Sequence, residues 1–213
     1  MANRYAAQGV EAEFEPHSRG RVLRNLQHIR SVREMQRSES EALLAATDAI
    51  IDSTRQDQRF TANDIRTMHR AWLGKIYEWA GEYRQVNIAK GDFMFAAANQ
   101  VPRLMQAFEG GPLQKFTPCR FEGIDEQARA LAVVHAELIL IHPFREGNGR
   151  CARLLSVLMG LQAGLPPLDF GGIRGAEKGR YIGAIHGAVA TDYAPMALIF
   201  RRVIERTLRR TSA

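Results

Sequence analysis

Apolar side chains recur at helical spacing near the start of the chain. The first such set, from residue 22 onward, is Val22, Leu23, Leu26 and Ile29. Because a helix turns once in about 3.6 residues, this spacing predicts a helix from Arg21 to about Asp52. Residues 1–20 contain glycine and proline breakers, so we expect an N-terminal arm there.

A second amphipathic stretch follows Thr61, whose hydroxyl is suited to cap a helix N-terminus. Its apolar face consists of Ile65, Met68, Trp72, Leu73 and Ile76. The pattern predicts a helix that ends at Gly81.

Segment 84–96 changes from helical spacing to alternation. Apolar residues alternate with polar ones on both sides of the turn sequence Lys90-Gly91-Asp92: Val86, Ile88, Phe93 and Phe95. Alternation around a glycine-containing turn predicts a β-hairpin, the only one expected in the chain.

The remaining chain is predicted to be mostly helical. Residues 99–109 form one helix, and 110–120 are expected to be a loop because they contain two glycines and two prolines. The run from Ile124 to Ile141 is strongly apolar and is expected to be the central buried helix. Further helices are predicted over residues 148–162, 177–190 and 195–209. The predicted fold class is therefore all-α, a helical bundle with one small hairpin.

The composition is that of a globular chain that can bury a core, with 213 residues, 46% hydrophobic and 24% charged. No apolar run reaches the roughly 18–20 residues that a bilayer requires, and the N-terminus lacks the apolar segment of a secretory signal. Two cysteines, Cys119 and Cys151, are too few for a disulfide framework. We therefore expect a cytoplasmic protein with no membrane partner.

The net charge of +6 and the pI of about 9.7 suit a partner rich in phosphate. Six arginines lie in or just before the first predicted helix: Arg19, Arg21, Arg24, Arg30, Arg33 and Arg37. Glutamates at 34, 39 and 41 interleave with them, which indicates a solvated face. Binding to nucleic acid is therefore disfavoured.

Residues 142–153, HPFREGNGRCAR, place charge and backbone freedom next to the predicted central helix. Pro143 disfavours helical geometry at His142, so the helix must end there. Phe144 is the only large apolar residue of the loop and is expected to pin it to the core. A simpler interpretation is a polar loop with a hydrogen-bonded core histidine, but the complete spacing favours a functional site.

Gly147-Asn148-Gly149 can turn backbone N–H groups inward, because glycine tolerates positive φ. These groups would lie at the N-terminus of the following helix, where the positive end of the helix dipole favours an anion. Phosphate is the natural occupant of such a site.

Arg150 and Arg153 are three residues apart on that helix and could grip successive phosphates. Glu146 is unsuited to contact a phosphate directly, but it could hold Mg²⁺ that bridges two phosphates. The segment is therefore interpreted as a magnesium–nucleotide site with a histidine base beside it.

HPFREGNGRCAR resembles the signature of the Fic family, H-x-F-x-(D/E)-G-N-G-R-x-x-R, at every fixed position. Residues 69–95 resemble the helix and flap segment of Fic proteins, and TDYAPM at 191–196 is similar to their C-terminal region. The resemblance covers about residues 20–205. It implies a single Fic domain over 21–213, with a core at about 60–200 and a flap at about 84–96.

The resemblance implies a protein adenylyltransferase that transfers AMP from Mg-ATP to a Tyr, Thr or Ser hydroxyl of a target protein. His142 would be the base that takes the hydroxyl proton, a task suited to imidazole. Glu146 would hold Mg²⁺ on the α- and β-phosphates. Asn148 and Arg150 would assist catalysis, with Arg150 at the β-phosphate. The implied nucleotide-binding residues are Phe144, Gly147, Asn148, Gly149, Arg150 and Arg153, the last at the γ-phosphate.

The hairpin resembles the flap at which Fic proteins dock an extended target segment. The implied docking residues are Lys90, Gly91, Asp92 and Phe93. A small structural ribbon is an equally good interpretation of the same residues.

Many Fic proteins silence themselves with an S/T-x-x-x-E-G/N helix whose glutamate reaches the arginine equivalent to Arg153. This chain has no copy of that pattern. The resemblance therefore implies a toxin-like enzyme whose inhibitory glutamate comes from a separate antitoxin. Constitutive activity and control by a homo-oligomer stay open.

Two alternatives to AMP transfer stay open. Relatives of the Doc type carry lysine where this chain has Gly149 and phosphorylate their targets, and others transfer UMP or phosphocholine. A non-catalytic module that binds a nucleotide or DNA is the second alternative, although it would need no base at His142.

Overall fold

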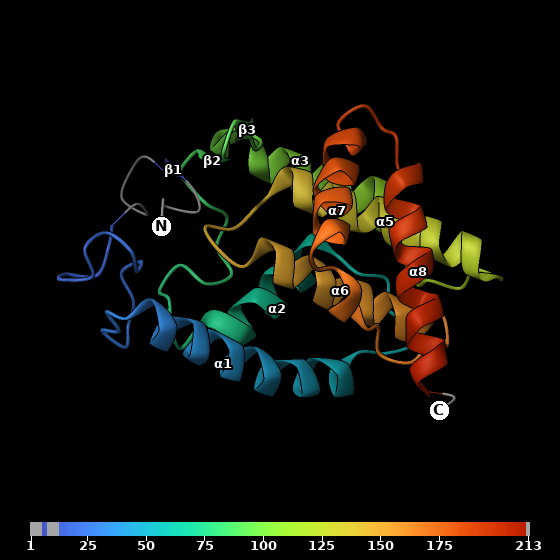
Figure 1. Cartoon of the computed structure of the whole chain (residues 1–213), viewed down its shortest axis with the longest axis horizontal. Coiled ribbons are helices and arrows are strands. Elements are labelled where there is room, and N and C mark those ends of the chain that lie inside the picture. The colour runs from blue at the N-terminus through green and yellow to red at the C-terminus, as the bar shows by residue number, and fades with distance from the viewer. Residues whose placement is uncertain (1–5, 8–12, 212–213) are drawn as a thin grey trace. The chain divides into compact units, whose positions relative to one another are not determined.

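The structure, a computed structural model, describes residues 6–7 and 13–211 and is dominated by helices (Figure 1). The α-helices are α1 (Val32–Ser53), α2 (Ala62–Leu73), α3 (Val101–Phe108), α4 (Gln114–Phe116), α5 (Ile124–Ile141), α6 (Asn148–Gln162), α7 (Ala176–Ala188) and α8 (Ala194–Thr211). The predicted all-α class is confirmed. Within the described ranges, no helix combines the length and the apolar character that a membrane span requires.

The predicted hairpin is confirmed, with β2 (Ile88–Lys90) antiparallel to β3 (Phe93–Met94). Lys90 pairs with Phe93, so Gly91 and Asp92 form the turn, and Gly91 has the positive φ of +59° that favours glycine there. A third short strand, β1 (Ala6–Ala7), pairs with the other edge of β2 and was not predicted. The rest of the predicted arm before residue 13 lies outside the described residues.

The first helix begins at Val32, so the prediction of helix from Arg21 is wrong for residues 21–31. The side chain of Asn25 replaces helical pairing there. Its Oδ1 accepts from the N–H of Gln27 and Ile29, and its Nδ2 donates to the carbonyls of Leu23 and Ile29. Asparagine competes in this way with helical hydrogen bonds. Val22 and Ile29 of the segment are still buried, whereas Leu26 is 53% exposed.

The second helix ends at Leu73 and not at the predicted Gly81. Gly74 follows directly, and glycine in a helix interior costs about 1 kcal/mol relative to alanine. The chain continues in turns in which Ile76 and Tyr77 donate to the Leu73 carbonyl. Ile76, Tyr77 and Ala80 are nonetheless buried, which explains why their spacing mimicked a longer helix.

The predicted loop over residues 110–120 is wrong for its first half. A π-helical turn, η3 (Glu109–Leu113), passes through Pro112 and leads into α4. Proline has no N–H, so α-helical pairing cannot continue through it. The wider turn carries the chain past it, with the N–H of Gln114 donating to the carbonyl of Glu109 five residues back.

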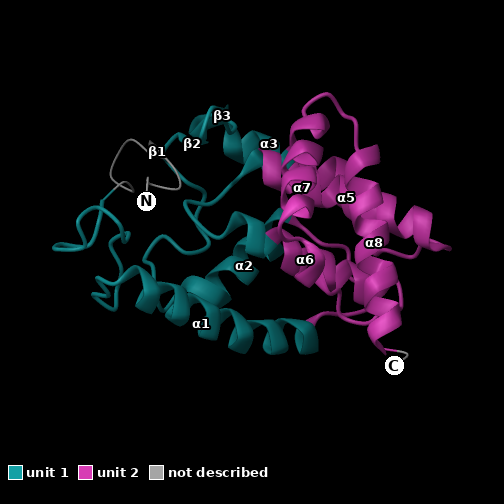
Figure 2. Ribbon diagram, viewed as in Figure 1, with its two compact units in different colours: residues 1–53, 62–106, 141–151 teal, residues 54–61, 107–140, 152–213 magenta. Residues whose placement is uncertain are grey.

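The other predicted helices are confirmed within a few residues: α3, α5, α6, α7 and α8. The chain forms two compact units that interleave along the sequence (Figure 2). The first unit comprises residues 1–53, 62–106 and 141–151, and the second comprises 54–61, 107–140 and 152–213. Trp72, Leu73 and Ile76 belong to a buried apolar cluster of the first unit. The predicted central helix α5 supplies fully buried residues of the second unit, such as Leu131.

Candidate active site

His142 is the first residue after α5 and marks the predicted end of that helix. Its φ of +52° lies in the left-handed region, which few non-glycine residues adopt. The side chain is only 4% exposed, and its ring stacks on Phe95 with the centroids 3.7 Å apart. Phe95 directly follows β3, so the flap segment fixes the plane of this imidazole.

Arg84, which the sequence did not single out, holds the backbone on which His142 lies. Its Nε donates to the carbonyl of His142 at 2.7 Å, and its own N–H donates to the carbonyl of Pro143 at 2.9 Å. Further guanidinium hydrogen bonds reach the carbonyls of Val86 and Ala96 in the flap segment. The side chain is 1% exposed, so this buried cation ties the flap segment to the loop after α5.

Phe144 and Asn148 close the motif loop, residues 142–147, onto the start of α6. The N–H of Phe144 donates to Oδ1 of Asn148 at 2.8 Å, and Nδ2 of Asn148 donates to the carbonyl of Phe144 at 2.7 Å. Phe144 is fully buried and stacks on His69 with the centroids 3.8 Å apart, so it pins the loop as predicted. The amide of Asn148 thus braces the loop in this structure.

His69 of α2 connects that stack to the loop backbone. The N–H of Gly81 donates to its Nδ1 at 2.9 Å, so Nε2 carries the proton and donates to the carbonyl of Glu146 at 3.0 Å. Burial lowers the pKa of His69 to about 4, so its ring is neutral near pH 7. A neutral ring with this tautomer satisfies both partners.

Gly147 must be glycine for two reasons. Its φ is +84°, and a Cβ there would lie 2.7 Å from a ring carbon of Trp72. Gly149 differs, since it has no positive φ and a Cβ there would meet nothing within 4 Å. Only one of the two predicted glycines therefore serves backbone freedom, whereas the other leaves open space at the start of α6.

The N-terminus of α6 supplies the predicted dipole. The N–H groups of Arg150 and Cys151 donate to the carbonyl of Gly147, which starts the helix, while the N–H of Gly147 donates to the Glu146 carboxylate. The first-turn N–H groups of a helix have no partner inside the helix. An anion at this end is therefore stabilised by both the dipole and those donors.

Arg150 is held by three neighbours. Its Nη1 lies 2.8 Å from a carboxylate oxygen of Glu39, and its Nη2 lies 3.5 Å from one of Glu146. The guanidinium carbon also lies 4.5 Å from the centroid of Trp72, a cation–π contact. These contacts offset the unfavourable position of a cation at a helix N-terminus.

Glu39 of α1 is the contact that the sequence did not identify. Its carboxylate accepts from the hydroxyl of Tyr77 at 2.8 Å, and its carbonyl accepts from Nε1 of Trp72 at 2.8 Å. The residue is 6% exposed. Its burial could have been predicted from helical spacing, because Glu39 follows the buried Met35 by one turn and so lies on the apolar face of the helix.

Replacing Glu39 by glutamine is expected to lower the free energy of unfolding by about 1–3 kcal/mol, because Arg150 loses a charged partner in a largely buried place. Urea denaturation measures this. Glu41→Gln on the same helix is the matched control: Glu41 pairs with Arg37 on the surface, and its loss should cost less than about 0.5 kcal/mol. Equal losses in the two variants would show that the buried pair has no special weight.

Arg153 lies one turn beyond Arg150 on α6, but it belongs to the second unit, where its own neighbours are aromatic. Its guanidinium carbon lies 5.7 Å from the centroid of Phe170 and 5.8 Å from that of Tyr181. Its Nε is buried without a hydrogen-bond partner among the described residues. The predicted residues from 142 to 150, in contrast, lie together in the first unit.

The predicted docking residues all lie in the hairpin. Lys90, Gly91 and Asp92 are exposed, and Phe93 is half-buried with its ring 5.2 Å from that of Phe95. Phe95 in turn stacks on His142, so the hairpin is linked to the histidine through two aromatic rings.

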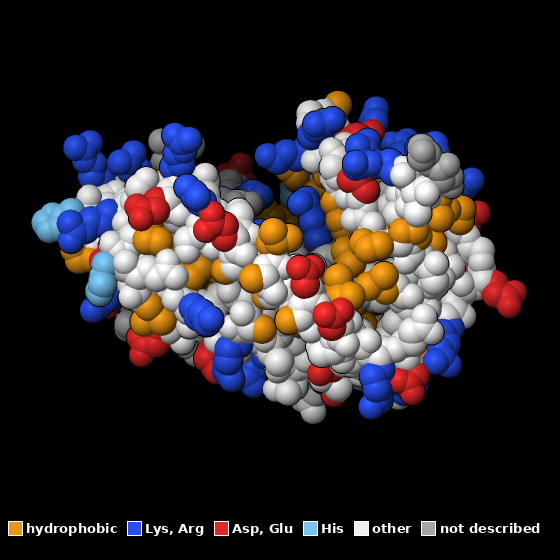
Figure 3. All heavy atoms as spheres, turned by 90° about the horizontal axis from the view of Figure 1, so that it is seen from below, with side chains coloured by type: hydrophobic (Ala, Val, Ile, Leu, Met, Phe, Trp, Pro, Cys, Tyr) orange, Lys and Arg blue, Asp and Glu red, His pale blue; other side chains and the backbone are white. Residues whose placement is uncertain are grey.

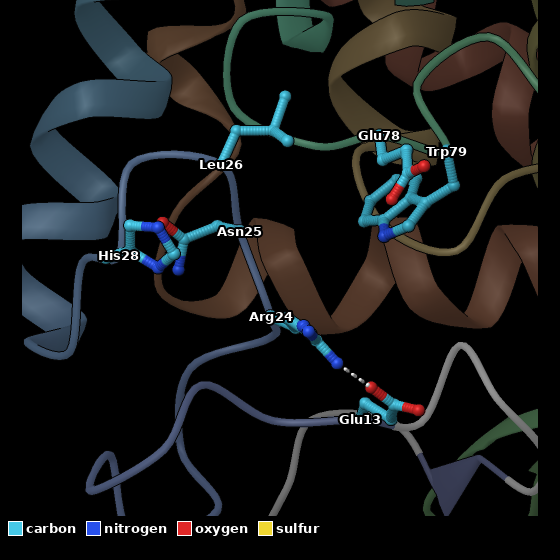
Figure 4. A pocket seen from close by; sticks show the side chains of 7 residues that line it. All are labelled: Glu13, Arg24, Asn25, Leu26, His28, Glu78 and Trp79. Carbon is cyan, nitrogen blue, oxygen red and sulfur yellow. Dashed lines mark hydrogen bonds and ion pairs between the residues drawn. The ribbon is translucent and has the colours of Figure 1, made fainter.

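A separate surface hollow of about 470 Å³ lies elsewhere in the first unit (Figure 4). Arg24 and Glu13 line it and form an ion pair with each other, and its lining also includes Leu26, Glu78 and Trp79. It shares no residue with the motif.

The chain is similar to known proteins throughout this region. The model of the Fic/DOC family matches residues 59–159. "Protein adenylyltransferase Fic" of Nematostella vectensis is 31% identical over 173 residues, which are 79% of this chain and 37% of that protein. "Probable protein adenylyltransferase y4lH" of Sinorhizobium fredii is 30% identical over 65% of this chain and 70% of its own length. The chain thus spans little more than a third of the first relative.

Solved structures that match the fold of this chain include Fic domains. The N-terminal Fic domain of a VirB-translocated Bep effector protein from Bartonella quintana, with bound ADP, matches with a TM-score of 0.71 and 25% identity, over 89% of this chain and 92% of that one. The BepC protein of Bartonella tribocorum with bound AMPPNP has a TM-score of 0.69 at 24% identity, over 85% and 91% of the two chains. With motif residues 142–150 together in the first unit, the matches in sequence and structure show that the chain belongs to the Fic/DOC family.

Proposed function

We propose that the protein is an adenylyltransferase that transfers AMP from ATP to a Tyr, Thr or Ser hydroxyl of a target protein. The observation that carries this proposal is His142 in the loop that leads to the N-terminus of α6, with its imidazole stacked on Phe95 and its backbone carbonyl held by Arg84. A base beside an anion site suits transfer at phosphorus. Relatives in Nematostella vectensis and Bartonella schoenbuchensis are named protein adenylyltransferases.

In the proposed step, the target hydroxyl oxygen attacks the α-phosphorus of ATP and His142 takes the hydroxyl proton. A bond forms from that oxygen to the α-phosphorus, and the bond from the α-phosphorus to the bridging oxygen breaks. Pyrophosphate leaves with that electron pair. A base positioned in this way contributes about 10²–10⁴-fold to the rate.

The phosphates would lie at the start of α6. The backbone of Gly147, Asn148 and Gly149 would surround the α- and β-phosphates, Arg150 would stabilise the departing pyrophosphate, and Arg153 would bind the γ-phosphate. The open space at Gly149 supports this placement, since nothing lies within 4 Å of its Cβ position. The ADP in the related Bartonella quintana structure supports a nucleotide as ligand. Phe144 would act through the loop that it pins.

Glu146 would hold Mg²⁺, which when bound neutralises phosphate charge. Among the described residues no group of three or more His, Cys, Asp and Glu side chains could hold a metal. A lone carboxylate nevertheless fits Mg²⁺, which commonly binds one or two carboxylates and takes its other ligands from phosphates and water. The carboxylate of Glu146 already accepts from the N–H of Gly147 at 3.0 Å, so it is oriented toward the start of α6.

The hairpin would dock the target through Lys90, Gly91, Asp92 and Phe93. Backbone pairing with a strand edge registers an extended segment without a long consensus. Three of these residues are exposed, which supports such access.

A separate antitoxin would regulate this toxin-like enzyme by placing a glutamate on Arg153. Arg150 already has Glu39 as partner, whereas Arg153 forms no ion pair within the described part of the chain.

We further propose that residues 21–213 act as one Fic domain with residues 1–20 as an arm, that the enzyme acts in the cytoplasm, and that it can form a homo-oligomer.

Transfer of a phosphoryl, UMP or phosphocholine group is the alternative that uses the same site. Binding to DNA has less support. On the face seen in Figure 3, Lys and Arg side chains of the described residues lie among Asp and Glu, and they form no continuous basic track there.

The test is incubation with lysate and ATP labelled at either the α- or the γ-phosphate. AMP transfer predicts that α label enters protein and γ label does not. Entry of γ label into protein would show that the enzyme transfers the γ-phosphoryl group and not AMP. A protein that binds no nucleotide and transfers neither label would refute the proposal.

A further inference from the structure

The second unit contains a buried polar chain that no step above uses. His135 of α5 is 1% exposed, and both ring nitrogens meet hydroxyl groups. Its Nδ1 lies 3.1 Å from Oγ of Ser156, and its Nε2 lies 2.7 Å from the hydroxyl oxygen of Tyr181 on α7. A buried histidine with two partners on two other helices fixes those partners in place.

The direction of each hydrogen bond in this series follows from the hydroxyl of Ser156. Ser156 donates its hydroxyl proton to the carbonyl of Ala152 at 2.8 Å, so its oxygen accepts from Nδ1–H of His135. Nε2 of the neutral ring is then the acceptor for the O–H of Tyr181. Burial, assisted by the charge of Arg153, lowers the pKa of His135 to about 3, and burial raises the pKa of Tyr181 to about 12. Both groups are therefore neutral near pH 7, as this arrangement requires.

Tyr181 connects the buried chain to Arg153. The guanidinium carbon of Arg153 lies 5.8 Å from the centroid of Tyr181 and 5.7 Å from that of Phe170. Cation–π contacts within about 6 Å attract a guanidinium without using its N–H donors. In the described ranges, no carboxylate pairs with Arg153. The aromatic rings thus hold the cation and leave its donors for an anion.

We propose that Tyr181, anchored by His135, is a positioning residue that orients the guanidinium of Arg153 toward the terminal phosphates of the nucleotide. This inference rests on the proposed function for the identity of the anion. Arg150 is oriented by the carboxylate of Glu39, whereas no carboxylate of the described residues pairs with Arg153. The orientation of Arg153 therefore depends on its aromatic contacts. Removing the ring should weaken recognition of the terminal phosphates and spare the rest of the nucleotide.

The first measurement needs no nucleotide. In an ¹H–¹⁵N spectrum of the full chain, the Nε–H signal of Arg153, assigned by its loss in Arg153→Lys, should be shifted upfield by the ring and protected from exchange. Tyr181→Leu should abolish that upfield shift, and Tyr181→Phe should keep most of it. Tyr193→Phe, which removes a hydroxyl that contacts Glu137 in the same unit, should leave the signal unchanged.

The second measurement compares ATP and AMP. Tyr181→Leu should weaken ATP binding and raise the KM for ATP by about 10-fold, within the range of a desolvated cation–π contact, with AMP binding and kcat little changed. Tyr181→Phe, which keeps the ring and loses the anchor, should show a smaller effect in the same direction. In an Arg153→Ala background, Tyr181→Leu should add little.

The outcomes separate the two proposals. An Arg153 signal that does not change in Tyr181→Leu would overturn the positioning role, and so would equal weakening of ATP and AMP, which indicates a general structural defect. A wild-type protein that binds neither nucleotide would refute the proposed function and with it the phosphate role of Arg153. The Nε–H signal would then still report whether Tyr181 holds the guanidinium.

Discussion

Replacing Arg84 by methionine is expected to lower the free energy of unfolding by about 3–5 kcal/mol, because several buried carbonyl groups lose a charged donor at about 1–3 kcal/mol each. Arg84 is 1% exposed and donates to backbone carbonyls from two separate segments. Methionine fills much of the same volume but donates no hydrogen bond, so the carbonyls of Val86 and His142 lose their partner. Urea denaturation at constant pH measures the change.

The same substitution should also reduce activity beyond its effect on stability. His142 adopts a φ of +52°, a conformation that surrounding contacts must maintain. Without Arg84 the loop can relax and the imidazole can leave its stack on Phe95. Arg84→Lys keeps the charge, but a single ammonium group cannot donate to all the carbonyls that the planar guanidinium contacts. This variant should therefore recover only part of the stability.

Arg55→Met is the control for Arg84→Met. Arg55 pairs with Asp57 at the surface, where loss of an ion pair costs less than about 1 kcal/mol. If the two variants unfolded at the same urea concentration, Arg84 would not have the structural weight assigned to it.

The motif loop could be predicted from the sequence because its parts are contiguous. His142, Gly147 and Arg150 lie within nine residues, and the loop between two helices brings them together without long-range contacts. Glu39 and Arg84 could not be found in this way. They lie 111 and 58 residues away from Arg150 and His142, and only the folded chain brings each pair together.

The errors at helix ends have a common origin. Apolar spacing indicated the burial of Ile29 and Ile76 correctly, although not that of Leu26, and it carries no information on which backbone groups are paired. Ile29 and Ile76 are both buried, yet one lies in a segment organised by the side chain of Asn25 and the other in turns after Gly74. Asn25 competes with helical pairing before α1 and delays the start of that helix, whereas Gly74 ends α2, and the apolar periodicity continues through both segments.

Replacing His142 is expected to lower the kcat of AMP transfer by about 10³-fold, within the range for loss of a general base, with little change in the affinity for ATP. The proposed phosphate-binding groups, the N-terminus of α6 and Arg150, remain in the variant. Alanine has a second effect, because a φ of +52° is strained for it. His142→Asn avoids this effect, since asparagine tolerates left-handed backbone and cannot act as a base.

Rates at saturating ATP and a fixed target concentration test this prediction, with thermal unfolding recorded for each variant. If the base accounts for the loss, His142→Ala and His142→Asn should lose activity equally although their stabilities differ. If activity instead returned in His142→Asn together with stability, the histidine would serve the loop backbone and not proton transfer. The geometry favours the first result, because the backbone of residue 142 is already held by Arg84, whereas its ring is held by Phe95. A structural role alone would not require an imidazole in that place.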